Sequence, residues 1–180
     1  MNRLIILDRD GVINEDSDHF IKSVDEFVPI EGSLEAMARL CGAGYRIAIA
    51  TNQSGIARGY YDHATLAAMH AKLRRLLKPL QGEIACIAYC PHAPDEGCEC
   101  RKPRSGLLRQ IAAQLGYDLH GVPVVGDSLR DLEAARRVGA QPVLVLTGKG
   151  ERTLAQGQGL EGIPRFTSLA CYVHDLLESI

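Results

Sequence analysis

The sequence predicts an α/β protein in which helices cover both faces of a parallel β-sheet. The first observation is a series of short apolar runs, each of which stops at a polar residue or a glycine. Runs that are apolar on both faces are typical of buried parallel strands. The second observation is that helical patterns, with apolar residues three or four positions apart, alternate with these runs. Strands that alternate with helices build a three-layer, Rossmann-like sandwich.

Five apolar runs predict the strands of this sheet. Each run is short, as strands in globular proteins usually are. Each is bounded by residues that favour turns or that carry polar side chains. The predicted strands cover residues 3–7, 46–50, 83–89, 122–125 and 142–146.

Apolar stripes at helical spacing predict five helices. Ser33 is the expected N-cap of the first helix, which Gly42 and Gly44 end. The second helix follows Asp62 and stops before Pro79. The other stripes cover residues 107–115, 132–138 and 169–177, and the glycine-rich stretch 147–164 is expected to be a surface loop.

Composition favours one globular domain over residues 1–180. Hydrophobic residues make up 46% of the chain, which is enough for a full core. With 20 Lys+Arg against 22 Asp+Glu the net charge is −2, which argues against a nucleic-acid partner. No apolar run is long enough to span a bilayer, and the N-terminus does not match a signal peptide. We therefore expect a cytoplasmic protein without a membrane partner.

Polar residues gather directly after the predicted strands. Asp8 and Asp10 follow the first strand, Thr51 the second, and Asp127 comes just after the fourth. Residues 90–102 follow the third. In open α/β sheets the ligand lies at the carboxyl ends of the strands, so these segments are expected to share one crevice.

The aspartates predict a magnesium site. In an extended chain Asp8 and Asp10 point the same way, and two carboxylates held together repel unless a cation or a proton separates them. Mg²⁺ with oxygen ligands is the natural partner, and Asp127 would be a further ligand. The alternative is an acidic turn at Asp8 and Asp10, with Asp127 as a helix cap and Asp131 in solvent.

The segment TNQSG (51–55) predicts an anion site. The Thr51 hydroxyl and the backbone N–H groups after it can cradle a phosphate, although an ordinary turn before the next helix would also fit. Lys102 offers a point charge and Arg101 a bidentate fork, and both suit phosphate. The residues implicated are Thr51, Asn52, Gln53, Ser54, Arg101 and Lys102.

The loop at residues 90–103 holds three cysteines and a histidine. Cys90, His92, Cys98 and Cys100 can complete a tetrahedral Zn²⁺ shell of the closed, structural kind. A disulfide disagrees with a reducing cytosol, and a redox pair would need Cys-x-x-Cys. The other cysteines, Cys41, Cys86 and Cys171, are expected to be small buried hydrophobes.

The four motifs DRDGVIN, TNQSG, a later lysine and GDSLRD occur in that order and resemble the haloacid dehalogenase superfamily of aspartate-nucleophile phosphatases. This resemblance implies that Asp8 is the nucleophile and Asp10 the general acid/base. It also implies that Asp8, the backbone of Asp10 and Asp127 hold Mg²⁺, while Thr51 and Lys102 hold the transferring phosphoryl group.

A zinc loop followed by CRKP is similar to two groups within that superfamily. These are the D-glycero-D-manno-heptose 1,7-bisphosphate 7-phosphatases of nucleotide-activated heptose and lipopolysaccharide synthesis, and the histidinol-phosphate phosphatases. We favour the first, because Arg101 could bind a distal phosphate and would repel a cationic amine. The resemblance also implies a sugar site at Asp16, Ser17, Asp18, His19 and Phe20.

No large cap domain fits this sequence, since the segment after Asp10 and the zinc loop are both short. The expected protein is a monomer with a minimal cap, acting on a small phosphorylated sugar. A nucleic-acid 3′-phosphatase shares the DxDG and TNQ-like motifs but would need a basic groove. A non-catalytic zinc-loop protein would lack a catalytic group, and none is missing here.

Overall fold

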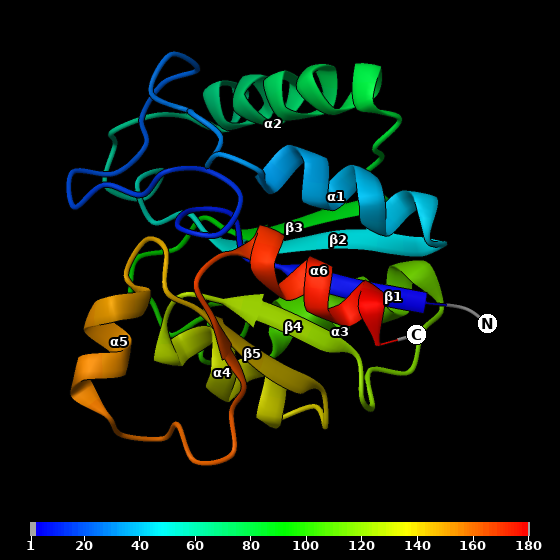
Figure 1. Cartoon of the computed structure of the whole chain (residues 1–180). Helices are drawn as coiled ribbons and strands as arrows, with labels where there is room; N and C mark the ends of the chain where they lie inside the picture. Colours follow the sequence, from blue (N-terminus) through cyan, green and yellow to red (C-terminus); the bar gives the residue numbers. More distant parts are fainter. Residues whose placement is uncertain (1–2, 180) are drawn as a thin grey trace.

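The structure of the protein is a computed structural model that describes residues 3–179. A six-stranded sheet with the order β3-β2-β1-β4-β5-β6 forms its centre, and every neighbouring pair of strands is parallel (Figure 1). This confirms the predicted Rossmann-like class. The strands are β1 (Arg3–Leu7), β2 (Tyr45–Asn52), β3 (Cys86–Cys90), β4 (Pro123–Gly126), β5 (Gln141–Val145) and β6 (Arg165–Phe166).

Helices cover both faces of the sheet, as predicted. One face packs against α1 (Ser33–Gly42), α2 (His63–Leu77) and α6 (Leu169–Glu178); in Figure 1, α1 and α2 lie above the sheet and α6 lies across β1 and β4. The other packs against α3 (Gly106–Leu115) and α4 (Leu129–Arg136). The remaining helical segments are η1 (Lys78–Leu80) and α5 (Gly150–Gln156).

Alternation along the buried strands sorts the core into two layers. Ile5 and Leu7 of β1 join the layer under α1, α2 and α6, whereas Leu4 and Ile6 join the layer under α3 and α4. All four side chains are at most 3% exposed, so both faces of β1 are removed from water. This is why the strands read as continuous apolar runs in the sequence.

Several predicted boundaries are wrong, among them the start of the first helix and the start of the third strand. Ser33 is the first residue of α1 rather than its cap; Gly32, at φ 80°, is the N-cap, and the Ser33 hydroxyl donates instead to the Ile13 carbonyl at 2.7 Å. The third strand begins at Cys86 and not at residue 83. Asp62 does cap α2, because its carboxylate accepts the Thr65 N–H at 2.8 Å.

The stretch expected to be a surface loop, residues 147–164, contains α5 and leads into β6. Helix α5 has only seven residues and lacks the repeated apolar stripe by which the other helices were predicted. Gly150 begins it in close contact with the sheet, since a Cβ there would lie 1.9 Å from the Val145 carbonyl oxygen. Contacts made by this segment bear directly on the site described below.

The expected burial of three cysteines is only partly correct. Cys86 is buried in β3, and Cys41 is half-buried with its thiol 3.4 Å from the Glu83 carbonyl. Cys171 is exposed, because α6 turns that position away from the core.

The segment between β1 and α1 forms a minimal cap. It is irregular chain held by isolated bridges from Asn14 to Asp10 and to Pro29. In Figure 1 it loops out at the same end of the sheet as the loops after β2 and β5. Across residues 3–179, no helix is long and apolar enough to cross a membrane.

Candidate active site

The carboxyl ends of the strands open into a cavity of about 310 Å³. It collects all of the predicted catalytic, magnesium and substrate residues except His19, which is exposed and does not line it. It also includes residues that the sequence analysis missed. The lining residues include Asp8, Asp10, Asp16, Ser17, Asp18, Phe20, Thr51, Asn52, Gln53, Ser54, Arg101, Lys102 and Asp127, together with the unpredicted Ile21, Arg58, Tyr61, Pro94, Ser128, Arg130, Asp131 and Lys149.

Asp8 sits where β1 meets β4. Its N–H donates to the Val125 carbonyl at 2.9 Å, and its carboxylate accepts the Arg9 N–H at 2.8 Å. Carboxylate oxygens of Asp8, Asp127 and Asp131 all lie within 4.8 Å of one another. Burial, followed by repulsion from Asp131, raises the pKa of Asp8 from 3.8 to about 7. The nucleophile expected from the sequence therefore lies in a site where burial and neighbouring carboxylates outweigh the lowering effect of the Lys102 charge.

Asp127 is fixed by the segment after β5. Its carboxylate accepts the Lys149 N–H at 2.8 Å, and its carbonyl accepts the Thr153 hydroxyl at 2.8 Å. Gly11 packs against it so closely that a Cβ there would lie 2.0 Å from Asp127 Oδ2. Burial and the charges of Asp8 and Asp131 raise the pKa of Asp127 to about 8. Buried carboxylates that repel one another are a donor set suited to a hard divalent cation.

Lys102 lies between two of these carboxylates. Its ammonium donates to Asp131 at 2.5 Å, to the Ala50 carbonyl at 2.7 Å and to Asp8 at 3.0 Å. Burial alone would lower the pKa of Lys102, but the charges of Asp131 and Asp8 outweigh it and raise that pKa. All three N–H directions of the ammonium are used, so its position is set by its partners.

Asp131 lines the cavity, although the sequence analysis gave it no role there and the alternative reading placed it in solvent. It is 2% exposed, and its second oxygen accepts the N–H and the hydroxyl of Ser128, at 3.1 and 2.8 Å. Ser128, and not Asp127, is the N-cap of α4, so the helix-cap alternative for Asp127 is wrong as well. The spacing of Asp127 and Asp131 was the available signal, because α4 turns the second aspartate back toward the first.

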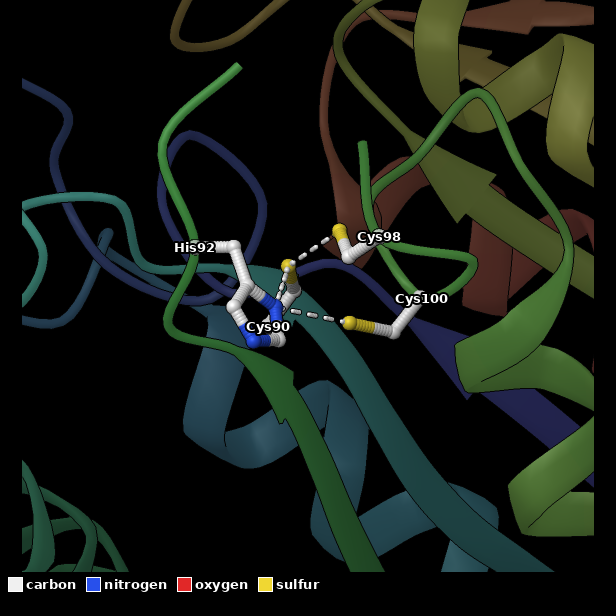
Figure 2. A group of neighbouring side chains, drawn as sticks. All are labelled: Cys90, His92, Cys98 and Cys100. Carbon is white, nitrogen blue, oxygen red and sulfur yellow. Dashed lines mark hydrogen bonds between the residues drawn. The ribbon is translucent and has the colours of Figure 1, made fainter. Parts of the chain in front are cut away.

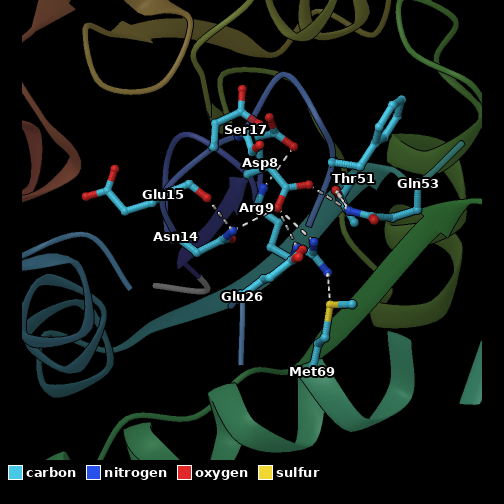
Figure 3. A network of polar contacts seen from close by, with 12 residues as sticks. Asp8, Arg9, Asn14, Glu15, Ser17, Glu26, Thr51, Gln53 and Met69 are labelled. Carbon is cyan, nitrogen blue, oxygen red and sulfur yellow. Dashed lines mark hydrogen bonds and ion pairs between the residues drawn. The ribbon is translucent and has the colours of Figure 1, made fainter. Parts of the chain in front are cut away.

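Asp10 is held by three side chains, Arg9 and Asn14 from the segment after β1 and Gln53 from the segment after β2, which are labelled in Figure 3. Its Oδ1 accepts Arg9 Nε at 3.1 Å, Arg9 Nη2 at 2.7 Å and Asn14 Nδ2 at 2.8 Å. Its Oδ2 accepts Gln53 Nε2 at 2.9 Å. Burial alone would raise the pKa of Asp10, but the Arg9 cation and these hydrogen bonds together lower it.

Thr51 is the second-last residue of strand β2 and does not lie in a loop, since β2 continues to Asn52. Thr51 is 1% exposed, and its hydroxyl oxygen accepts Gln53 Nε2 at 2.9 Å. Asn52 pairs with the backbone of Lys102 in both directions, at 3.0 and 3.1 Å. The segment 51–55 and Lys102 are thereby joined by hydrogen bonds between the Asn52 side chain and the Lys102 main chain.

Basic side chains line another part of the cavity. Arg101 is half-buried, and its Nη1 is buried without a hydrogen-bond partner among the residues described. Burial and the nearby charges of Arg130 and Arg58 lower the pKa of Arg101. Arg58 also stacks over the Phe20 ring, 5.4 Å from its centroid. A guanidinium whose buried Nη1 has no partner among the described residues, and which lies near two further cations, is suited to an anion.

The cysteine loop folds into a cluster next to β3 (Figure 2). Cys90 Sγ lies 3.4 Å from His92 Nδ1 and 3.6 Å from Cys98 Sγ, while His92 Nδ1 lies 3.2 Å from Cys100 Sγ. A tetrahedral zinc with bonds of about 2.3 Å to sulfur and 2.0 Å to nitrogen needs ligand atoms roughly 3.5–3.8 Å apart. The cluster therefore fits a metal site, and its last cysteine directly precedes Arg101 and Lys102.

These features define a class of protein. The carboxyl edge of the parallel sheet brings together a partly buried aspartate after the first strand, a second aspartate two positions on, a lysine paired with the first, and a further acidic pair. That is the site of a cation-dependent phosphatase with the haloacid dehalogenase type of fold.

Comparisons with known proteins agree with this class. Residues 3–130 match the family described as polynucleotide kinase 3 phosphatase, and residues 99–170 match the HAD-hydrolase-like family. A D-glycero-beta-D-manno-heptose-1,7-bisphosphate 7-phosphatase from Pseudomonas aeruginosa is 60% identical over 97% of this chain and 98% of its own. One from Bordetella bronchiseptica is 53% identical over 98% of each chain.

Solved structures give the same result. The crystal structure of D,D-heptose 1,7-bisphosphate phosphatase from B. bronchiseptica, complexed with magnesium and phosphate, superposes with a TM-score of 0.96 at 53% identity and covers 99% of each chain. The chain belongs to the haloacid dehalogenase-like phosphatases, in the family of the heptose 1,7-bisphosphate 7-phosphatases.

Proposed function

We propose that this phosphatase removes the C7 phosphate of D-glycero-β-D-manno-heptose 1,7-bisphosphate, in nucleotide-activated heptose synthesis. The relatives that bear this name match nearly the full length of the chain. The observation that carries the substrate assignment is the buried, unpaired Nη1 of Arg101 beside Arg130, in the same cavity as the acidic centre. A bisphosphate supplies one anion for the acidic, metal-binding part of the cavity and a second for the arginines.

Asp8 is the proposed nucleophile. Its carboxylate oxygen attacks phosphorus, and the bond from phosphorus to the C7 oxygen breaks. In this proposal the negative charge of the bound phosphate raises the pKa of Asp10, so that its Oδ2 carries a proton. Asp10 gives that proton to the departing sugar oxygen and later takes a proton from the water that cleaves the aspartyl phosphate. The Lys102 N–H that points to Asp8, at 3.0 Å, would be shared with a phosphoryl oxygen bound there, and the Thr51 hydroxyl would hold another during both steps.

Magnesium fits the acidic centre, because burial and mutual repulsion raise the pKa values of Asp8 and Asp127. Asp8, the Asp10 carbonyl and Asp127 would hold the ion, which when bound neutralises charge on the phosphoryl group. Asp131 is a poor ligand, since both of its oxygens are already hydrogen-bonded to Lys102 and Ser128. We assign it instead to fixing Lys102.

Zinc is the proposed metal of the cluster formed by Cys90, His92, Cys98 and Cys100, in a structural role. All four ligand positions come from the protein, which leaves none for water. The cluster anchors an irregular loop whose next residues are Arg101 and Lys102, so it would set the direction in which both enter the cavity. The free cysteines agree with a reducing, cytoplasmic setting.

A substrate panel tests the assignment. We expect kcat/KM to be highest for the heptose 1,7-bisphosphate, lower for the heptose 7-phosphate and lowest for histidinol phosphate. Arg101→Ala should raise KM for the bisphosphate about tenfold or more and leave the 7-phosphate almost unchanged, because a hydrogen bond to a charged group contributes about 1.5–3 kcal/mol. Arg137→Ala is the matched control, since Arg137 does not line this cavity.

A preference for histidinol phosphate would overturn the substrate assignment and leave the phosphatase class in place. A 3′-phosphorylated oligonucleotide belongs in the same panel, because a polynucleotide phosphatase family matches residues 3–130. We expect no turnover of it, since the net charge of −2 provides no extended basic surface for a nucleic acid.

A further inference from the structure

Arg9 is the most deeply buried charged side chain in the described chain, and the mechanism above gives it no role. Its side chain is 0% exposed and carries five N–H donors. Nε and Nη2 both donate to Oδ1 of Asp10, at 3.1 and 2.7 Å. Burying an arginine is expensive unless its charge is matched, so this contact has a stabilising role and also fixes a geometry.

The Arg9 contact leaves the two oxygens of Asp10 unequal. With Asn14 Nδ2 at 2.8 Å, Oδ1 accepts three hydrogen bonds, and it has no free direction for a proton. Oδ2 accepts only Gln53 Nε2 at 2.9 Å and is the oxygen that remains available.

The other end of the Arg9 guanidinium is held by helix α2. Nη1 contacts His70 Nε2 at 3.3 Å and Met69 Sδ at 3.7 Å, and the guanidinium lies over the Phe27 ring, 5.4 Å from its centroid. Burial and the Arg9 charge lower the pKa of His70 to about 3, so its ring is neutral and Nε2 accepts. His70 does not line the active-site cavity.

We infer that Arg9, held from behind by His70, is a positioning residue that locks the Asp10 carboxylate so that Oδ2 faces the departing oxygen. The inference rests on the proposed role of Asp10 as general acid/base. Without the guanidinium, Oδ1 keeps only the Asn14 amide, and the carboxylate can rotate away from the line of transfer. A sugar oxygen is a poor leaving group and departs as the alcohol only if it receives the proton, so rotation slows that step specifically.

The test compares two leaving groups. The value of kcat/KM depends on binding and on the steps up to the first bond cleavage. It therefore reports on departure of the sugar oxygen and not on the later attack of water. We would measure it for the heptose bisphosphate and for p-nitrophenyl phosphate, whose nitrophenolate departs without a proton. Asp10→Asn gives the reference, with an expected loss on the sugar about 10²–10⁴-fold greater than on the aryl phosphate.

Arg9→Met should lower kcat/KM for the sugar phosphate about tenfold or more beyond its effect on the aryl phosphate. Arg9→Lys keeps the charge but not the two-pronged guanidinium, so it should give an intermediate difference between the two substrates. His70→Leu removes the acceptor that contacts Arg9 Nη1. It tests the same inference if Arg9→Met does not fold. His70→Gln restores an acceptor and should recover the wild-type ratio. Leu73→Met, at a buried position of the same helix, is the matched control and should change the ratio by less than about twofold.

The outcomes separate the two hypotheses. Suppose that Asp10→Asn affects the sugar phosphate more than the aryl phosphate, but the Arg9 and His70→Leu variants lower kcat/KM for both substrates by the same factor. Then Arg9 is only structural and the inference is overturned. If Asp10→Asn is itself unselective, then Asp10 is not the general acid, and the proposed role and the inference both fail. Selectivity in Asp10→Asn, Arg9→Met and His70→Leu, with recovery in His70→Gln, supports the positioning role.

Discussion

Replacing Asp131 with asparagine keeps the shape of the side chain and removes the charge that holds Lys102. In the native structure one oxygen accepts the Lys102 ammonium at 2.5 Å and the other accepts the Ser128 N–H and hydroxyl. An asparagine can keep its oxygen toward Lys102 only by turning its NH₂ group toward the Ser128 N–H. Two donors then face each other in a site where Asp131 is 2% exposed.

The magnitude follows from these contacts. A buried N–H left without an acceptor costs about 1–3 kcal/mol, and changing a charged hydrogen bond into a neutral one costs about 1 kcal/mol more. Relief of the repulsion that Asp131 exerts on Asp8 and Asp127 offsets part of this loss. We expect a net destabilisation of about 2 kcal/mol, which for a domain of this size is roughly 4–8 °C in Tm.

Thermal unfolding followed by circular dichroism measures the effect, and steady-state kinetics measures its consequence for Lys102. Turnover should fall more than about tenfold, because a catalytic group misplaced by about 1 Å can cost of the order of 10²-fold. Glu133→Gln is the control, since it makes the same charge change on the same helix, away from the cavity. A Tm within about 2 °C of wild type and unchanged turnover would refute the assignment of Asp131 as the anchor of Lys102.

Three further results are expected. Asp8→Asn should abolish turnover while the circular dichroism spectrum stays native, and retained phosphate release would show that another group is the nucleophile. Replacing Cys98 and Cys100 together by serine should remove zinc, measured by atomic emission, and raise KM or lower Tm; loss of the metal with neither change would contradict the anchoring role. The pKa values of Asp8 and Asp127 are raised from 3.8 to about 7 and about 8, so the metal-free protein should lose stability as pH rises from about 4 to about 8. Magnesium should reverse that loss, and a gain in Tm on adding MgCl₂ that is not larger at pH 8 than at pH 5 would contradict the burial of these charges.

The layers of the fold could be predicted because the pattern that indicates each strand or helix lies within a few consecutive residues of the chain. Apolar runs that stop at polar residues indicate strands buried on both faces, and the structure places Ile5 and Leu7 on one face and Leu4 and Ile6 on the other. The short helix α5 was missed, because seven residues without an apolar stripe carry too little periodic signal.

Most of the cavity residues were predictable for a related reason. Parallel strands bring their carboxyl ends to one edge, so residues that follow different strands were expected to meet. Asp8, Thr51 and Asp127 do line one cavity. His19 does not, because it lies in an irregular segment where no repeating pattern sets the direction of a side chain.

The sequence by itself determined the fold class, the two aspartates after the first strand, the order of the motifs and the set of four metal-ligating side chains. Only the tertiary structure decided which charged side chains contact one another. Asp131 accepts a hydrogen bond from Lys102 and does not face solvent, and Arg9 lies in the core, in contact with His70 and Asp10. The physical reason is that a motif records residue types and spacing along the chain. Which buried charge meets which counter-charge depends on how the strands, α2 and α4 pack, and burial then makes those pairings strong enough to position catalytic groups.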